Sequence, residues 1–370
     1  MNVKSVSQLA GRSSPVLALA PRYYTDADIF LQEKEKIFFR TWQIAGHVSQ
    51  VGNPGDYFTF HICDQSLFVM RGMDSQLRAF YNVCKHRAHE LLTDQGNTSR
   101  IVCPYHAWTY ETNGRLQRAP NSENVPGFDP STICLSDVRL EVFCGYIFVN
   151  LDPDAKPMGE LFPGVEAEIR EFVPAIDDLK LAHAYSAEEK ANWKIAVENY
   201  NECYHCRVVH KAFTSGVVAG ESFDIVPDGY CLRHTARAAQ KSAYGYDQAQ
   251  VDHAQDYKSW FLWPTFSIQV YPGSIVNTYR WWTNSVSRSV IYRQWWLPNG
   301  EVTEEQMKVI ELDRTQTFAE DLSIIKSVQC GLASRGYNPG PLIIDPAGGV
   351  NNELSVSALH NLVVEALGEE

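Results

Sequence analysis

The sequence predicts an α+β protein made of a small antiparallel β domain and a larger part that mixes helices with strands. Residues 43–151 contain short runs of β-branched and aromatic residues, separated by glycine, asparagine and aspartate. After a proline-rich, acidic stretch at 152–165, helical patterns alternate with aromatic strands. The length of 370 residues allows about two domains of roughly 150 residues each.

The first part begins with a helix and continues with strands. Residues 22–42 interleave charged and apolar residues at helical spacing, with Thr25 or Asp26 as the candidate N-cap. The β-rich runs that follow are DYFTFHI, QSLFVMRG, QLRAFYNV, SRIVCPY, AWTYETNG and VRLEVFCGYIFVNL. Asn113-Gly114 indicates a hairpin turn, because both residues tolerate positive φ.

The second part mixes helices and strands. Residues 191–213 predict one long helix, and residues 303–333 predict another that begins with a capping box from Thr303 to Gln306. Between the two helices, residues 260–297 hold the aromatic strands FSIQVYP, IVNTYRWWT and SVIYRQWWLP. The proline- and glycine-rich stretch NPGPLIIDPAGGVNN predicts an ordered loop or arm.

Composition excludes several classes of protein. No apolar run reaches the roughly 18 residues that a membrane span needs, and the N-terminus lacks the basic and apolar pattern of a signal peptide. A formal charge of −12 argues against nucleic acid, which rewards basic surfaces. Nine cysteines are an odd number and favour free thiols in a reducing compartment. We therefore expect a cytoplasmic protein.

Two Cys/His clusters carry the first chemical signal. Cys84 and His86 form one, and Cys103 and His106 form the other, 16 residues further on. Together they offer two thiolates and two imidazoles, the ligand set of a mixed [2Fe-2S] cluster in which one iron keeps two cysteines and the other takes two histidines. The spacing resembles the Rieske signature, and it predicts a carrier of single electrons. His89 fits no ligand spacing.

A structural zinc site is the alternative for the same four residues, since Cys2His2 tetrahedra are common. Zinc sites usually group like ligands as CxxC followed by HxxxH, whereas each loop here offers one cysteine and one histidine. The pattern favours the iron–sulfur cluster.

A second motif lies within 191–213. Glu202, His205 and His210 suggest a mononuclear iron held by two histidines and a carboxylate, with open positions for O2. At about 100° per residue, the two histidines differ by roughly 140° around an ideal helix. Both could not face one metal, so the pattern predicts a break or π-bulge between them.

The Rieske stretch followed by NWKxxxENYxExYHxxxxH resembles the large subunit of Rieske non-haem iron oxygenases over nearly the whole chain. The resemblance implies a Rieske domain at 43–155 and a helix-grip catalytic domain formed by 1–42 and 156–370. The catalytic domain would contain a large antiparallel sheet covered by helices. It also implies that His205 and His210 bind mononuclear Fe(II) and that Asp321 is the third ligand. Asp313 is a poorer match for that position.

The resemblance also implies how electrons travel. A separate flavin and iron–sulfur NAD(P)H reductase would reduce the cluster, which would then reduce the mononuclear iron across the interface of a homotrimer. Glu202 stands where most family members have aspartate, a departure shared with the quaternary ammonium group of the family. It would bridge His205 to a cluster ligand of the neighbouring subunit, for which we favour His106. A surface glutamate paired with Arg207 or Lys211 is the alternative.

Aromatic residues suggest the substrate, because aromatic faces attract quaternary ammonium groups. Seven of nine tryptophans lie between 193 and 296. Most of these aromatics are expected to build the strand core. The candidate cage residues are Trp260, Trp263, Tyr271 and Tyr279, and Arg280 or Arg293 are candidates for a substrate carboxylate.

These features indicate N-demethylation of a betaine with release of formaldehyde. Proline betaine (stachydrine) is the first choice, followed by glycine betaine or carnitine. The rivals are an aromatic-ring dioxygenase and, from a different class, an electron-transfer or structural zinc protein.

Cys203 and Cys206 form a CxxC, and with Cys231 and His234 they could be drawn as another zinc site or as a redox pair. A thioredoxin-like motif should follow a strand, whereas this one interrupts a helical pattern. We expect buried, free cysteines here.

Overall fold

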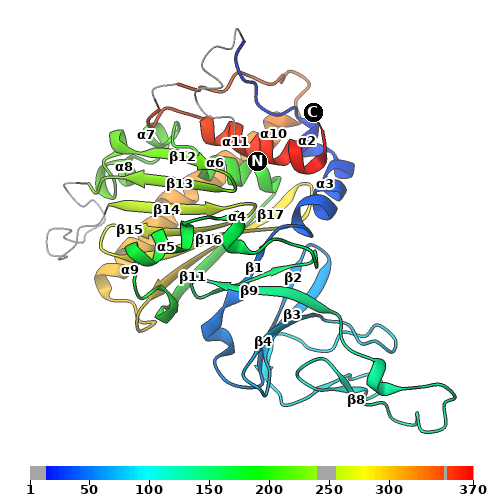
Figure 1. The fold of residues 1–370 in the computed structure, drawn as a ribbon. Coiled ribbons are helices and arrows are strands. Elements are labelled where there is room, and N and C mark those ends of the chain that lie inside the picture. Colours follow the sequence, from blue (N-terminus) through cyan, green and yellow to red (C-terminus); the bar gives the residue numbers. More distant parts are fainter. Residues whose placement is uncertain (1–13, 240–255, 346–347, 370) are drawn as a thin grey trace. The chain divides into compact units, whose positions relative to one another are not determined.

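The computed structural model describes residues 14–239, 256–345 and 348–369, which form two compact units (Figure 1). One unit is Phe38–Met158, and the other combines the chain up to Ile37 with the chain from Gly159 onward. The smaller unit is therefore an insertion in the sequence of the larger one. The N-terminal residues considered for a signal peptide lie mostly outside the described residues, as do residues 346 and 347 of the expected arm. No helix in the described part is long and apolar enough to cross a membrane.

The smaller unit is built from antiparallel strands, as expected. Its main sheet has the order β1-β10-β9-β4-β3-β2-β5, and a second, three-stranded sheet has the order β6-β7-β8. β3 lies inside the main sheet, and its residues from Leu67 to Met70 are fully buried. The strands are β1 (Gln43–His47), β2 (Asp56–Ile62), β3 (Gln65–Arg71), β4 (Leu77–Tyr81), β5 (Gln95–Asn97), β6 (Ile101–Val102), β7 (Thr109–Tyr110), β8 (Leu116–Arg118), β9 (Asp137–Phe143) and β10 (Tyr146–Asn150). All six β-rich runs of the sequence contain strands.

The hairpin expected at Asn113-Gly114 joins β7 to β8. Gly114 has φ +90°, and a Cβ placed there would lie 2.7 Å from the ring of Phe80. Glycine is therefore needed at this turn both for its backbone conformation and for space.

The larger unit contains one antiparallel sheet with the order β11-β17-β16-β15-β14-β13-β12. β15 lies in the middle and every one of its residues is buried, whereas the edge strand β11 is largely exposed. The strands are β11 (Lys180–Glu189), β12 (Asp224–Asp228), β13 (Cys231–Ala236), β14 (Tyr257–Leu262), β15 (Phe266–Tyr271), β16 (Ile275–Ser285) and β17 (Arg288–Leu297).

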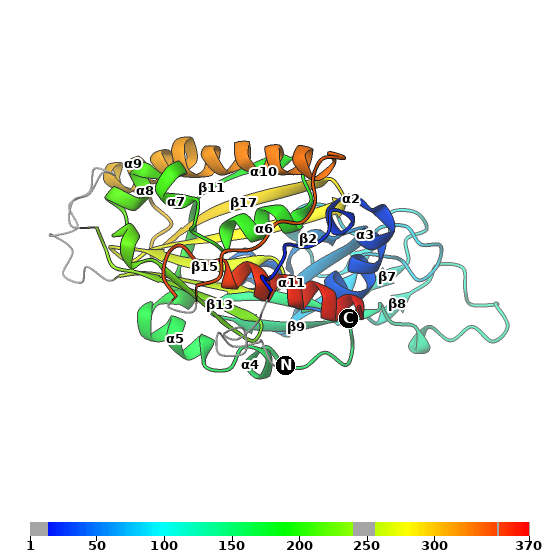
Figure 2. The same cartoon turned by 90° about the horizontal axis from the view of Figure 1, so that it is seen from above.

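Helices cover this sheet. α6 contacts β16, α10 contacts β11 and α11 contacts β12, while α6 also contacts both other helices. These three helices therefore lie side by side over the sheet (Figure 2). The helices are α2 (Arg22–Thr25), α3 (Ala27–Glu33), α4 (Met158–Leu161), α5 (Val165–Phe172), α6 (Trp193–Tyr200), α7 (Cys206–Val209), α8 (Lys211–Gly216), α9 (Glu304–Leu312), α10 (Phe318–Leu332) and α11 (Leu354–Leu367). The arrangement confirms the expected α+β fold.

Some helical expectations need correction. The helix expected at 22–42 is divided into α2, α3 and a π-helical turn η1 (Lys34–Phe38), so it ends four residues early. Asp26 is the N-cap of α3 and accepts a hydrogen bond from the Asp28 backbone at 2.8 Å. The capping box from Thr303 to Gln306 is present, but a π-helical turn η7 (Asp313–Thr317) separates α9 from α10. α11 follows the expected arm and was not anticipated.

A buried ion pair ties the N-terminal segment to the rest of the larger unit. Glu33 accepts hydrogen bonds from the Lys194 ammonium and, at 2.9 Å, from the Trp193 indole. Glu33 and Lys194 are almost completely inaccessible to solvent. Buried charges require such partners, because removal from water is costly.

Candidate metal centres and active site

The helix expected over 191–213 is broken. α6 ends at Tyr200, α7 begins after His205, and His210 stands between α7 and α8 with the non-helical angles φ −98° and ψ 60°. A short helical turn, α7, joins the two histidines, and the His210 N–H donates to the Cys206 carbonyl at 2.8 Å, so the break or π-bulge expected between them is not found. The chain instead departs from helical geometry between α6 and His205 and at His210 itself.

The folded chain brings the two histidines together with Asp321 on α10. His205 Nε2 lies 3.1 Å from His210 Nε2, and Asp321 Oδ1 lies 2.9 Å from His210 Nε2 and 3.6 Å from His205 Nε2. Ligands about 2.1 Å from one metal and at right angles to each other would be roughly 3.0 Å apart. The spacing therefore suits two imidazoles and one carboxylate on one face of an octahedral ion.

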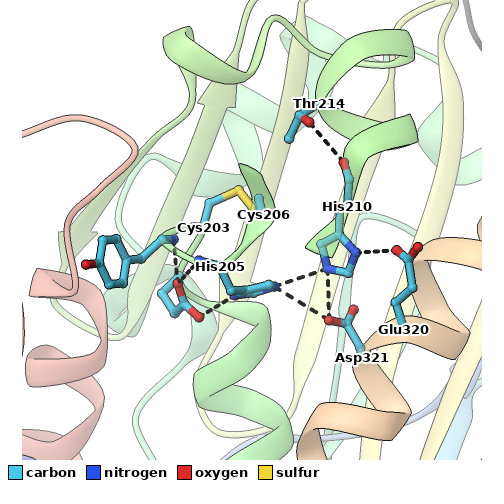
Figure 3. Close-up of polar contacts among 9 residues, drawn as sticks. Cys203, His205, Cys206, His210, Thr214, Glu320 and Asp321 are labelled. Atoms are coloured by element: carbon cyan, nitrogen blue, oxygen red, sulfur yellow. Dashed lines mark hydrogen bonds and ion pairs between the residues drawn. A yellow bond between two sulfur atoms is a disulfide. The ribbon is translucent and has the colours of Figure 1, made fainter. Parts of the chain in front are cut away.

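Two further carboxylates orient the imidazoles from behind (Figure 3). Glu202 contacts His205 Nδ1, and Glu320 Oε2 lies 2.8 Å from His210 Nδ1. An imidazole that donates from Nδ1 presents its Nε2 lone pair to a metal. Glu202 also accepts from the Tyr204 backbone at 2.5 Å. The role of Glu320 was missed from the sequence, where only its place beside Asp321 could have suggested it.

Charge at this site favours a cation. Burial lowers the pKa of His205, but hydrogen bonds to Asp321 and Glu202 outweigh it and raise the pKa to about 10. Burial also lowers the pKa of His210, but its hydrogen bonds with Asp321 and Glu320 outweigh this effect and raise the pKa overall. Burial would raise the pKa of Asp321, but the two histidines lower it overall. A divalent cation would take the place of the imidazole protons and meet the same carboxylates.

Asp313, the poorer match for the third ligand, lies elsewhere. It is buried and accepts hydrogen bonds from Tyr271 at 2.6 Å, from Tyr185 at 2.5 Å and from Arg293 at 3.1 Å. Its carboxylate is therefore already satisfied by protein donors.

The two Cys/His clusters of the smaller unit form a pair of loops with matching hydrogen bonds. In the first loop the Cys84 N–H donates to the His89 carbonyl, and in the second the Cys103 N–H donates to the Trp108 carbonyl. Ala88 and Ala107 occupy equivalent places with φ of 57° and 55° and donate back to the carbonyl of their cysteine. Two similar tips are thus built to hold ligands of one group between them.

Burial separates the four candidate ligands into like pairs. Cys84 and Cys103 are buried, and their proximity is one cause of the raised pKa of Cys103, after burial itself. His86 and His106 are exposed, with ring centroids 4.6 Å apart. The inner cysteines suit one iron and the outer histidines suit the other.

The zinc alternative does not fit this geometry. A tetrahedral zinc would hold its four donor atoms within roughly 4 Å of one another. In the part of the chain that the structure describes, His205, His210 and Asp321 are the one group of three or more such donors within 4.8 Å. The two Cys/His loops lack that convergence, and so do the cysteines at 203, 206 and 231 with His234.

A cavity with an empty volume of about 430 Å³, part of it open to solvent, adjoins the candidate iron ligands. Aromatic residues make up much of its wall. Among the described residues, no lysine or arginine lines it. The aromatic lining residues are Tyr200, Phe213, Phe223, Tyr257, Tyr271 and Tyr279. His234 also lines it, and burial lowers the pKa of this histidine to about 3, which keeps its imidazole neutral.

Two candidate cage residues are placed outside this cavity, which corrects the expectation from sequence. The Trp260 indole donates to Glu168 at 3.0 Å, and Trp263 packs against Trp193 with ring centroids 5.9 Å apart. Neither lines the cavity, whereas Tyr271 and Tyr279 do. The alternation of aromatic and polar residues along a strand does not show which face of the sheet lines a cavity.

The candidate arginines are also outside it. Arg293 is fully buried, pairs with Asp313, and lies with its guanidinium carbon 4.0 Å from the ring centroid of Tyr279. Arg280 stacks on Tyr292. Neither is a free donor for a substrate carboxylate in the cavity.

The expectation of free cysteines at 203 and 206 is wrong. The two residues form a disulfide, with Cα atoms 4.9 Å apart (Figure 3). The chain leaves the helix after Tyr200, and the resulting turn brings the two side chains together. They are buried, as expected, and they line the cavity.

Comparisons with known proteins agree with these features. The sequence matches the Rieske [2Fe-2S] domain over residues 41–129 and the ring hydroxylating alpha subunit (catalytic domain) over residues 176–369. The carnitine monooxygenase oxygenase subunit of Escherichia coli (strain K12) is 36% identical over 348 residues, covering 93% of this chain and 92% of the relative. The glycine betaine monooxygenase oxygenase subunit of Pseudomonas aeruginosa (strain UCBPP-PA14) is 33% identical over 194 residues, covering 52% and 44%.

A solved structure supports the same conclusion. It is a quaternary ammonium Rieske monooxygenase, described in connection with carnitine oxidation and inter-subunit electron transfer. It shares 30% identity with this chain at a TM-score of 0.89, and the match covers 99% of this chain and 98% of the other.

Fold and site together define the oxygenase subunit of a Rieske-type system, with an electron-transfer domain and a catalytic domain. Its cofactors are a Rieske [2Fe-2S] cluster and a mononuclear iron. The chain belongs to the family of ring hydroxylating alpha subunits.

Proposed function

We propose that this chain is the oxygenase component of a monooxygenase that hydroxylates an N-methyl group of a betaine. The hydroxylated methyl group leaves as formaldehyde, so the net reaction is N-demethylation. Proline betaine is the first-choice substrate, and carnitine and glycine betaine are the alternatives. The names of the relatives support quaternary ammonium substrates as a class.

The cavity carries this proposal. A quaternary ammonium group has no N–H to donate, so a site recognises it through aromatic faces and negative charge. Six aromatic side chains line the cavity. No lysine or arginine among the described residues opposes a cation there, and His234 stays neutral.

The substrate carboxylate needs hydrogen-bond donors, and the described wall of the cavity offers uncharged ones. Arg293 is committed to Asp313, so we assign this role to uncharged groups of the wall, such as the side-chain amide of Asn199.

We propose the metal ligands residue by residue. Cys84, His86, Cys103 and His106 hold the Rieske cluster, and His205, His210 and Asp321 hold the mononuclear iron. The cluster supplies single electrons, and the iron supplies activation of O2. The chain's own contribution is to fix both imidazoles through Glu202 and Glu320.

Electrons would enter through a partner. Glu202 fixes His205 Nδ1, and on the proposed path it also accepts a hydrogen bond from His106 of the partner subunit in a homotrimer. His106 is exposed, as a residue at such an interface must be in the isolated chain. A separate NAD(P)H-dependent reductase would supply the cluster.

Formaldehyde release tests the proposal. The purified oxygenase, a matching reductase, NADH and O2 are incubated with proline betaine, glycine betaine, carnitine and a neutral arene. We expect formaldehyde and the demethylated amine from a betaine only. Oxidation of the arene to a diol without formaldehyde would instead identify an aromatic-ring dioxygenase. The His205→Ala variant should lose turnover and keep the visible Rieske spectrum, whereas loss of the spectrum would contradict the two-site assignment.

A further inference from the structure

The Cys203–Cys206 disulfide occupies an unusual place for a cysteine pair. It lies in the turn that contains His205 and follows directly on Glu202. Both cysteines line the active-site cavity, although they are only 3% and 5% exposed. A small molecule inside the cavity therefore reaches sulfur atoms that are closed to a large one.

The oxidised pair is compatible with an ordered metal site. With the disulfide formed, His205 still contacts Glu202, and its Nε2 remains 3.1 Å from His210 Nε2. The bridge spans only the turn, as the Cα separation of 4.9 Å shows, and this separation is ordinary for a disulfide. Oxidation of these two sulfurs thus leaves the candidate ligands in place.

We propose that Cys203 and Cys206 are a peroxide-reactive thiol pair that removes hydrogen peroxide inside the active-site cavity. Peroxide is the two-electron reduction product of O2, and its formation at this site when no substrate is hydroxylated rests on the proposed function. The reaction itself rests on the pair alone.

The chemistry balances for each peroxide. One thiol attacks the peroxide, so that an S–O bond forms, the O–O bond breaks and one water leaves. The second thiol then attacks the sulfenic sulfur, an S–S bond forms and a second water leaves. Both cysteines are oxidised, and one H2O2 is reduced to two waters. A small thiol of the glutathione class restores the pair by exchange, and two such thiols are oxidised in turn.

Position distinguishes this pair from the other cysteines. Cys231 is buried on β13 and free, and burial raises its thiol pKa to about 12. Cys134 and Cys330 are exposed and free. Among the described cysteines, the pair at 203 and 206 is the one that forms a disulfide, and it lines the wall beside the candidate iron ligands.

Mass mapping tests the proposal without turnover. The holoprotein is reduced with a small thiol, freed of it, and titrated with up to a few equivalents of H2O2. It is then alkylated under denaturing conditions and digested with trypsin. Residues 195–207 form one peptide with both cysteines. We expect this peptide to become lighter by two hydrogens and resistant to alkylation, while the peptide with Cys231 stays alkylated and the Rieske spectrum persists.

If residues 195–207 stay fully alkylated while the Rieske spectrum bleaches or other thiols oxidise first, the pair is not a peroxide trap. In the Cys203→Ser and Cys206→Ser variants the remaining thiol has no partner, so we expect one oxygen to be added to that cysteine and no disulfide to form. Cys231→Ser is the matched control and should behave as the wild type does. Disulfide formation without formaldehyde release would overturn only the proposed function.

Discussion

His210 Nδ1 and Glu320 Oε2 lie 2.8 Å apart, although 110 residues separate them in the sequence. Glu320 precedes the candidate ligand Asp321, so adjacent residues of α10 contact opposite nitrogens of one imidazole. The Nδ1–H group donates to Glu320, which leaves the Nε2 lone pair for a metal. The orientation of His210 is therefore fixed from two sides.

Removing Glu320 should weaken metal binding. We expect Glu320→Ala to lower the affinity for Co²⁺ or Fe²⁺ by about 10- to 100-fold, because the imidazole loses the acceptor that orients it. Glu320→Gln keeps an acceptor oxygen and should recover part of the loss. Metal titration with the Rieske spectrum as an internal reference measures both. The control is Glu311→Ala, whose exposed carboxylate contacts Arg314; equal losses in the control would refute the role.

Glu202 should control electron transfer more than it controls folding. In Glu202→Gln the side chain keeps its length but loses its charge, so its hold on His205 Nδ1 weakens. We expect the reductase to reduce the Rieske cluster at the normal rate, and reoxidation of the reduced cluster by O2 and substrate to slow by about 10- to 100-fold. Stopped-flow absorbance of the cluster separates the two steps. Unchanged reoxidation would exclude Glu202 from the path.

Asp313 should be needed for stability. Asp313→Asn leaves the buried guanidinium of Arg293 without its counter-ion, and loss of one partner of such a pair costs about 3–5 kcal/mol. Chemical denaturation of the catalytic unit, followed by tryptophan fluorescence, should show this loss. The exposed Asp178 provides the control Asp178→Asn, for which we expect less than about 0.5 kcal/mol. A similar small value for Asp313→Asn would show that Arg293 finds another partner.

His234 should make the protein sensitive to acid. Burial lowers its pKa from 6.5 to about 3. Between these values the unfolded chain binds a proton that the folded chain does not, so this stability is present above pH 6.5 and is lost as the pH falls toward 3. Between pH 6.5 and 5 the loss should be about 2 kcal/mol.

The His234→Gln variant isolates this effect. Glutamine can still donate to Asn201, whose Oδ1 lies 3.0 Å from His234 Nε2, but it does not titrate. Its free energy of unfolding should fall about 2 kcal/mol less than that of the wild type over the same pH range. Parallel curves for the two proteins would mean that His234 is protonated in the folded state.

Much of the fold was predictable from local pattern. The strand expected from DYFTFHI corresponds residue for residue to Asp56–Ile62, because alternating residues and flanking turns mark its ends. The helical pattern of 191–213 is continuous and gives no sign of a break. The need for two histidines on one metal predicted a break, but placed it between His205 and His210, where the short helix α7 lies. α11 was missed because it follows a proline- and glycine-rich stretch that gave no reason to expect a return to helix.

The site was predictable where spacing fixes chemistry. The sequence spacing of Cys84 from His86 and of Cys103 from His106 predicts that both cysteines are cluster ligands. Glu320 did not follow, because an acidic residue on a helix is usually solvated. The placement of the buried Trp260 away from the cavity depends on which side of β14 meets the cavity. The disulfide depends on a turn that the sequence pattern does not show.

The contact between Glu33 and Lys194 also bears on the order in which this chain matures on the ribosome. The two residues are 161 positions apart, and the whole of the smaller unit is synthesised between them. Each domain tends to fold as a unit during synthesis. The cluster-binding unit is therefore synthesised in full, and can fold, before Lys194, the buried partner of Glu33 in the larger unit, is added to the chain.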